Sequence, residues 1–302
     1  MSNNNHWTTE NIPDQTGRVA IVTGANSGLG FETSKALAAK GAAVIMACRN
    51  VEKGNAAAEK IRGENPSGNV QVMQLDLADL DSIQRFAGAF PDTFDRLDLL
   101  TNNAGVMAIP QAQTANGFEM QFGTNHLGHF ALTSLLIGQL LETSPNGRVV
   151  TVSSNTHRIG NIDLANLNAE KSYSRWHAYG LSKLANLLFA YELQRKLQAA
   201  GSSVISVAAH PGYSSTNLQG NSGIFSMLNP ILAQSQEMGA LPSLYAATEP
   251  EVNGGDYIGP SGFMEQRGYP RKVKSSDRSY DEATAARLWQ VSEKLTGANF
   301  PV

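Results

Sequence analysis

The chain has 302 residues, of which 41% are apolar and 16% charged, and its formal net charge at pH 7 is −3. This length suits one large α/β domain better than two domains with separate cores, so we expect a single domain over residues 1–302. The slightly acidic net charge offers no broad basic surface for binding nucleic acid.

One cysteine, Cys48, cannot form an internal disulfide. Residues 1–17, which we interpret as an N-terminal extension, lack the apolar stretch of a signal peptide, so we expect a cytoplasmic protein.

No stretch reaches the roughly 18 uninterrupted apolar residues that a membrane-spanning helix requires. The most apolar segment, Phe130 to Leu141, is interrupted by polar residues and a glycine. We therefore expect no integral membrane segment. The partners that remain are a small-molecule substrate and, as an open possibility, further copies of the chain.

Short apolar runs alternate along the chain with longer stretches at helical spacing. The predicted strands are Arg18–Thr23, Ala43–Ala47, Asn69–Leu75, Leu97–Thr101, Gly147–Val152, Ser203–Ala208 and Asp256–Ile258. The predicted helices are Ser27–Lys40, Val51–Arg62, Asp79–Phe90, Asn116–Leu141, Arg175–Ala200 and Tyr280–Leu295. This alternation predicts right-handed crossovers and a buried parallel sheet. The expected fold class is α/β: a doubly wound, Rossmann-type sheet of about seven strands with helices on both faces.

The alternation loosens over residues 213–250, where Gly, Asn and Pro punctuate an apolar stretch that includes Ile224, Phe225 and Leu228. One interpretation is a substrate lid over an apolar ligand, and we name residues 213–250 the lid region. The other interpretation is a pair of ordinary amphipathic helices that pack inward. The sequence does not separate the two.

A glycine-rich segment, Thr23-Gly24-Ala25-Asn26-Ser27-Gly28-Leu29-Gly30, directly follows the first predicted strand and opens a predicted helix. Glycines permit a tight turn and a close approach of the backbone to a pyrophosphate. The free N–H groups and the dipole at the start of a helix attract negative charge. The spacing TGxxxGxG therefore predicts a dinucleotide site, although a glycine-rich turn that binds nothing is the alternative.

The second predicted strand ends in Arg49-Asn50 rather than in an acidic residue. An acidic residue there would bind ribose hydroxyls and repel a 2′-phosphate, whereas arginine would attract that phosphate. Arg49 thus favours NADP(H), with NAD(H) as the less favoured cofactor, and Asn26 could add a neutral donor. The alternative for Arg49 is a surface ion pair with Glu52.

Tyr179 and Lys183 form a YxxxK pair within a predicted helix, so both side chains share one face. A free tyrosine titrates near pH ~10, and work near neutrality requires a lower pKa, which an adjacent ammonium could supply. The alternative is a surface Tyr–Lys pair. Upstream, the predicted strand Gly147–Val152 ends in two hydroxyls, Ser153 and Ser154, of which period-two alternation lets only one face the site.

The order of these motifs resembles the short-chain dehydrogenase/reductase family. TGxxxGxG is that family's glycine motif, Asn102-Asn103-Ala104-Gly105 matches its NNAG motif, and Pro211-Gly212 matches its PG motif. The resemblance implies catalytic roles for Asn125, Ser154, Tyr179 and Lys183. It also implies a cofactor site made of Gly24, Asn26, Ser27, Gly28, Leu29, Gly30, Arg49, Asn50, Asp76, Leu77, Asn103, Ala104, Gly105, Tyr179, Lys183, Pro211, Gly212 and Thr216. No metal is expected, because His126 and His129 lack a third ligand.

Ser154 and Tyr179 are 25 positions apart, farther than in many members of the family. This stretch, with Lys183-Leu184-Ala185-Asn186, resembles the branch of retinol dehydrogenases, the WW-domain oxidoreductase and light-dependent protochlorophyllide reductase. That likeness implies a large apolar substrate such as a retinal-like aldehyde, a ketone or another lipophilic carbonyl.

The motifs together predict an NADP(H)-dependent oxidoreductase that transfers a hydride between the nicotinamide and a carbonyl or alcohol, acting on the CH–OH group. A non-catalytic NADP(H)-binding sensor protein with the same fold is the alternative. A sugar-nucleotide epimerase or dehydratase of the extended relatives is disfavoured, because those carry a different glycine spacing and a longer substrate-binding end.

Overall fold

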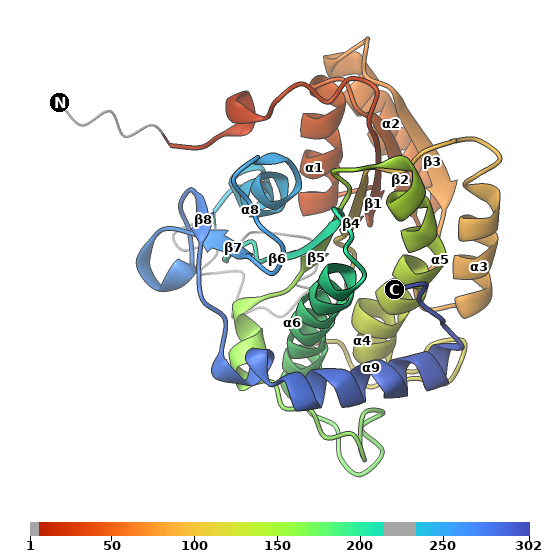
Figure 1. Cartoon of the computed structure of the whole chain (residues 1–302), viewed down its shortest axis with the longest axis vertical. Helices are drawn as coiled ribbons and strands as arrows, with labels where there is room; N and C mark the ends of the chain where they lie inside the picture. Colours follow the sequence, from red (N-terminus) through yellow and green to blue (C-terminus); the bar gives the residue numbers. More distant parts are fainter. Residues whose placement is uncertain (1–5, 214–233) are drawn as a thin grey trace.

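The computed structural model describes residues 6–213 and 234–302, and a central sheet organises them (Figure 1). Its strands are β1 (Val19–Thr23), β2 (Ala43–Cys48), β3 (Val70–Gln74), β4 (Leu99–Asn102), β5 (Arg148–Val152), β6 (Ile205–Ala209), β7 (Tyr257–Pro260) and β8 (Pro270–Lys272). Their order is β3-β2-β1-β4-β5-β6-β7-β8. Strands β1 to β7 pair in parallel, and β8 is antiparallel to β7. The chain therefore has the predicted Rossmann-type α/β fold.

Helices cover both faces of this sheet (Figure 1). They are α1 (Gly28–Ala39), α2 (Val51–Glu64), α3 (Leu80–Ala89), α4 (Met120–Phe122), α5 (Gly128–Thr143), α6 (Arg175–Ala199), α8 (Gln236–Thr248) and α9 (Glu282–Thr296). One apolar core lies between the sheet and α1, α2 and α8, and a second lies between the sheet and α3, α5, α6 and α9. Strand β1 serves both cores, since Ala20 and Val22 face the first and Val19 and Ile21 the second.

The predicted helix Asn116–Leu141 is interrupted in the structure. Helix α4 begins only at Met120, because the Glu119 carboxylate accepts the N–H groups of Gln121 and Phe122 and caps the helix start. A π-helical turn, η2 (Gly123–Leu127), then leads into α5. Such turns insert an extra residue and are frequent at functional sites. Strand β8 was also not predicted, because three residues that begin with proline carry no alternating pattern.

Part of the predicted lid region belongs to the scaffold. Helix α8 packs against α1, and its residues Ala240, Leu241 and Leu244 are buried in the first core. Residues 214–233, which include the predicted apolar lid residues and Thr216, lie outside the described residues. The residues that flank them are joined, since the N–H of Gln234 donates to the carbonyl of Tyr213 at 2.9 Å. The lid itself stays a prediction.

The described part of the N-terminal extension runs along α8. The indole of Trp7 donates a hydrogen bond to Glu249 at 2.9 Å and meets the ring of Tyr245 edge-on. Ile12 is buried in the first core. Within residues 6–213 and 234–302, no helix has the length and apolar character needed to cross a membrane.

Candidate active site

A cavity of about 950 Å³ opens at the carboxyl ends of the strands. In open α/β sheets, ligands bind at this edge where the strand order reverses, which here is between β1 and β4. Most of the predicted cofactor residues line the cavity: Gly24, Asn26, Ser27, Gly28, Leu29, Gly30, Arg49, Asp76, Leu77, Asn103, Ala104, Gly105, Tyr179, Lys183 and Pro211. The volume falls in the range of ligand sites.

The glycine loop forms a tight cradle at one wall of this cavity. Gly24 and Gly28 have φ values of 67° and 59°, a left-handed conformation that favours glycine. A Cβ on Gly30 would lie 2.5 Å from the carbonyl oxygen of Gly24 and 2.6 Å from Asn103 Nδ2. The loop can therefore adopt this shape only with glycines, and the residues present fit a dinucleotide pyrophosphate.

Thr23 connects the glycine loop to the segment after β4. Its Oγ1 accepts the main-chain N–H groups of Asn103 and Ala104, both at 2.9 Å, and lies 2.9 Å from His129 Nε2. His129 Nδ1 lies 2.9 Å from the main-chain oxygen of Asn125. A carbonyl can only accept, so Nδ1 carries the proton and Nε2 accepts from the threonine hydroxyl. Burial lowers the pKa of His129 to about 4, so it is neutral at pH 7.

Asn125 lies in the π-helical turn with its side chain fully engaged. Its Oδ1 accepts from the N–H of Val106 at 2.8 Å, and its Nδ2 donates to the Val106 carbonyl and to Ser182 Oγ, both at 2.9 Å. The amide thereby holds the segment after β4 against helix α6. Its side chain is fully buried, behind the cavity wall to which Val106 contributes.

Tyr179 and Lys183 lie one turn apart on α6, and both line the cavity. The Lys183 ammonium is 5.7 Å from the centre of the Tyr179 ring and donates to the main-chain oxygen of Val152 at 3.0 Å. Burial lowers the pKa of Lys183 to about 8. The alternative of a surface Tyr–Lys pair is excluded, because both side chains are buried.

The pKa of Tyr179 does not show the predicted lowering by Lys183. Burial raises it to about 12, and only a hydrogen bond with Ser154 acts in the opposite direction. The reason is geometric: Lys183 is directed to the Val152 carbonyl, and no hydrogen bond joins it to the phenol among the described contacts. The protein alone therefore holds Tyr179 in its protonated, proton-donating form at neutral pH.

The two candidate serines have different surroundings. The Ser153 hydroxyl donates to the main-chain oxygen of Lys183 at 2.8 Å and is thus occupied, although Ser153 contributes to the cavity wall. The Ser154 hydroxyl contacts Tyr179 and lies 3.0 Å from Thr156 Oγ1, at the start of the 3-10 turn η3 (Asn155–Ile159). Contact with the phenol favours Ser154 as the serine that acts with Tyr179.

Cations gather at the other end of the cavity. Arg49 lines it together with Lys53 and Lys60 of α2, two residues that sequence reasoning missed because their contribution depends on how α2 packs. None of the ion pairs among the described residues includes Arg49 or Glu52, so the alternative pairing of these two is not found. The predicted cofactor residue Asn50 is not part of the described cavity wall. Its Oδ1 instead accepts the N–H of Lys53 and caps the start of α2.

Two further predicted residues differ in position from the rest. Gly212 does not contribute to the described cavity wall, but with φ 68° it makes the turn after Pro211, which does. Thr216 lies outside the described residues.

His126 lies beside Ser292 of α9, its Nε2 2.9 Å from the hydroxyl, whereas His129 binds Thr23, so the two imidazoles contact different partners.

A glycine cradle, a cationic end and a buried Tyr–Lys pair share one cavity, which defines a nucleotide-binding α/β protein equipped for oxidoreductase chemistry. The family model for short chain dehydrogenases matches residues 18–224. The chain belongs to the short-chain dehydrogenase/reductase family and is an oxidoreductase of that family.

Named relatives belong to the retinol dehydrogenase-like group. The chain is 42% identical over 286 residues to retinol dehydrogenase 12 of Mus musculus, covering 93% of this chain and 87% of the relative. It is 42% identical over 297 residues to retinol dehydrogenase 13 of Homo sapiens, covering 94% and 86%. The predicted resemblance to this branch is therefore confirmed.

Solved structures agree with the fold. A protein of Mycobacterium paratuberculosis described as uncharacterized has a TM-score of 0.84 at 46% identity, with 98% of this chain and 100% of that chain covered. A short chain dehydrogenase from Shigella flexneri 2a, solved in complex with NADP, has a TM-score of 0.66 at 25% identity over 81% of this chain and 97% of that chain.

Proposed function

We propose that this protein is an NADP(H)-preferring dehydrogenase or reductase that interconverts an apolar carbonyl compound and its alcohol. The observation that carries this proposal is the distribution of groups in one cavity. Arg49, Lys53 and Lys60 come from the end of β2 and from α2, whereas Tyr179 and Lys183 come from α6 beside β5 and β6, which β1 and β4 separate from β2. Three cations favour the extra phosphate of NADP(H) over the bare ribose of NAD(H).

The cofactor would be held by the glycine cradle at its pyrophosphate and by Arg49 and the two lysines at its 2′-phosphate. When bound, the nicotinamide supplies or accepts the hydride. Tyr179 donates the proton to the substrate oxygen during reduction and takes it back during oxidation. Ser154, in contact with the phenol, stabilises the negative charge that grows on this oxygen. Lys183, fixed on the Val152 carbonyl, contributes positive charge beside the phenol.

An apolar substrate is supported by the aromatic surroundings of Tyr179. The Trp176 ring meets the Tyr179 ring edge-on, with centroids 6.4 Å apart, and Trp176 is 41% exposed. Trp176 is not part of the described cavity wall, but an exposed aromatic ring against the phenol offers apolar surface to a lipophilic substrate. The names of the retinol dehydrogenases point to the same class, so a retinal-like aldehyde is the first substrate to test.

The test is NADPH and NADH consumption with a panel of aldehydes that runs from short polar compounds to retinal. We expect turnover with NADPH to exceed that with NADH, and apolar aldehydes to exceed polar ones in kcat/KM. Equal rates with both cofactors would contradict the NADP(H) preference. Equal rates across the panel would contradict the apolar substrate, and NADPH binding without any turnover would support the sensor instead. The cytoplasmic location and the oligomeric state stay predictions.

A further inference from the structure

The turn between β7 and β8, Ser261–Tyr269, has an unusual backbone and approaches the active site from outside the cavity. Met264 and Glu265 have φ values of 49° and 57°, which residues other than glycine rarely adopt. Two main-chain hydrogen bonds close the turn, from Ser261 to Tyr269 at 2.8 Å and from Gly262 to Arg267 at 2.9 Å. These bonds within the turn hold the rarely adopted conformation of Met264 and Glu265.

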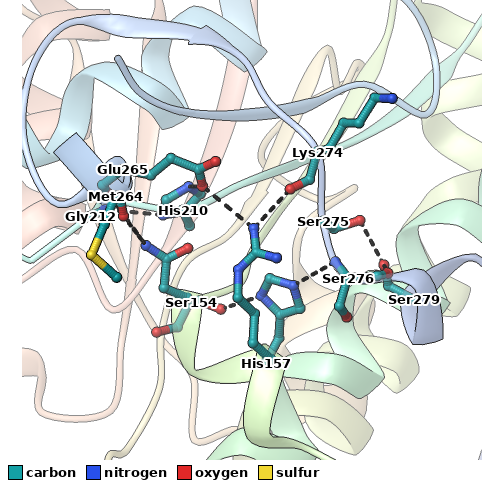
Figure 2. A network of polar contacts seen from close by, with 12 residues as sticks. Ser154, His157, His210, Gly212, Met264, Glu265, Lys274, Ser275, Ser276 and Ser279 are labelled. Atoms are coloured by element: carbon teal, nitrogen blue, oxygen red, sulfur yellow. Dashed lines mark hydrogen bonds and ion pairs between the residues drawn. The ribbon is translucent and has the colours of Figure 1, made fainter. Parts of the chain in front are cut away.

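Glu265 in this turn binds His210, which follows β6 (Figure 2). His210 Nε2 lies 3.0 Å from Glu265 Oε2, and His210 Nδ1 accepts the N–H of Gly212 at 3.3 Å. Burial lowers the pKa of His210, so its imidazole is neutral at pH 7. Since Nδ1 accepts, the proton is on Nε2 and is donated to the carboxylate. Glu265 therefore stabilises the tautomer with its proton on Nε2, which leaves Nδ1 free to accept the hydrogen bond from Gly212.

Main-chain contacts join the same turn to the residues that follow Pro211. The carbonyl of Gln266 accepts the N–H of Tyr213 at 2.8 Å. A Cβ on Gly212 would lie 2.4 Å from this carbonyl oxygen, so only glycine permits the approach. On its other side, the turn accepts hydrogen bonds of 3.4 Å from Asn155, the neighbour of Ser154, at the carbonyls of Met264 and Glu265.

Pro211 lies at the Tyr179 end of the cavity. Strands β5 and β6 end side by side there, since Ser153 N donates to the carbonyl of Ala209 at 2.8 Å. Pro211 lines the cavity together with Tyr179, but Glu265 is not part of its described wall. The Glu265 carboxylate also lies 3.9 Å from Arg158, which is not part of the described wall either. Its shorter contact, with His210, leads through the Pro211-Gly212 turn to the cavity.

We propose that Glu265 is a positioning residue for the nicotinamide half of the cofactor, acting through His210 on the Pro211-Gly212 turn. The inference rests on the proposed function, because it assumes that the cavity binds NADP(H). It predicts that Glu265 affects the binding of a whole dinucleotide but not of a fragment that ends at the adenosine phosphates.

The test compares the dissociation constants of NADPH and adenosine 2′,5′-bisphosphate for the full chain and its variants, by calorimetry. Glu265→Ala removes the partner of a charge-assisted hydrogen bond, so we expect NADPH to bind about tenfold more weakly and the bisphosphate to bind unchanged. Glu265→Gln keeps an oxygen that accepts from His210, so it should retain most of the affinity for NADPH. Phe263→Ala is the matched control, because Phe263 is in the same turn and is 85% exposed.

Three outcomes would overturn the proposal. Unchanged NADPH affinity in Glu265→Ala would show that the turn holds its position without the carboxylate. Equal weakening of both ligands would show a general structural defect. An equal loss in Phe263→Ala would show that any change in the turn has the same effect. Failure of the unaltered chain to bind NADPH would instead contradict the proposed function, and the inference with it.

Discussion

The ammonium of Lys183 donates a hydrogen bond to the main-chain oxygen of Val152, which joins helix α6 to the end of strand β5. Asn186, one turn further along α6, donates to the same oxygen at 3.0 Å. The helix that carries Tyr179 is thereby fixed to the strand that leads into Ser154. The relative positions of the phenol and the serine hydroxyl thus follow from contacts made by neighbouring residues.

Replacement of Tyr179 by phenylalanine removes the proposed proton donor and leaves the buried ring. We expect kcat to fall by about a thousandfold, since general acid catalysis contributes factors of this order. The dissociation constant of NADPH should stay within about twofold, because the glycine cradle and the cationic end are untouched. Stopped-flow and equilibrium titration measure the two quantities, and an unchanged kcat would refute the role of Tyr179.

Replacement of Arg49 by aspartate reverses the charge at the proposed 2′-phosphate site. We expect the ratio of kcat/KM with NADPH to that with NADH to fall at least about tenfold, equivalent to about 1.4 kcal/mol. Arg85→Asp makes the same change in net charge on the exposed face of α3 and serves as the control. If both variants alter the ratio equally, the effect comes from overall charge and not from this site.

Helix α6 approaches η3 so closely that Gly180 should not tolerate a methyl group. A Cβ there would lie 2.9 Å from the carbonyl oxygen of Thr156 and 3.1 Å from Gly160 N. We expect Gly180→Ala to lower the free energy of unfolding by about 2 kcal/mol. Gly138→Ala in α5, where no described atom lies within 4 Å, should raise it by roughly 0.5–1 kcal/mol. Urea denaturation measures both, and similar effects in the two variants would disprove the close contact.

Buried histidines should make the folded state sensitive to acid. Burial lowers the pKa values of His129 and His157 to about 4 from 6.5, so between these values the unfolded chain binds protons that the folded chain does not. The free energy of unfolding therefore falls as the pH is lowered through this window, by about 2 kcal/mol per histidine at pH 5.

The variant His157→Gln tests this linkage. Nε2 of His157 accepts the N–H of Ser276 at 3.0 Å, a bond that protonation would break (Figure 2). We expect the slope of unfolding free energy against pH between 6.5 and 4 to decrease by about one proton in this variant. The exposed His177 provides the control His177→Gln, which should keep the original slope. Parallel curves for the unaltered chain and His157→Gln would contradict the assignment.

Much of the fold follows from local patterns. The strands β1 and β5 are buried along nearly their whole length, and their β-branched and apolar residues identify them without any knowledge of contacts. The π-helical turn at Asn125 has no such signal, because one extra residue hardly changes an apolar helix pattern. Likewise, the cap that Glu119 provides depends on side-chain geometry that residue spacing does not contain.

The candidate site likewise contains features that the sequence predicts and features that it does not. The glycine cradle and the Tyr179–Lys183 pair are encoded by residues close in sequence, and the structure places them in one cavity. The pair of His210 and Glu265 joins positions 55 apart, and no local pattern relates them. The raised pKa of Tyr179 also could not be predicted from the sequence, since it depends on how deeply the phenol is buried and on the direction in which Lys183 points.

The hydrogen bond between Tyr213 and Gln234 holds together the two described residues that flank residues 214–233. Each doubling in length of a connecting chain costs only about 0.6 kcal/mol of closure entropy when its ends are already fixed. Residues 214–233 could thus lengthen, shorten or be exchanged with those of a relative while the catalytic helix and the glycine cradle stay intact. Such an exchange would test the predicted substrate lid, because it should alter substrate preference and leave proton transfer by Tyr179 intact.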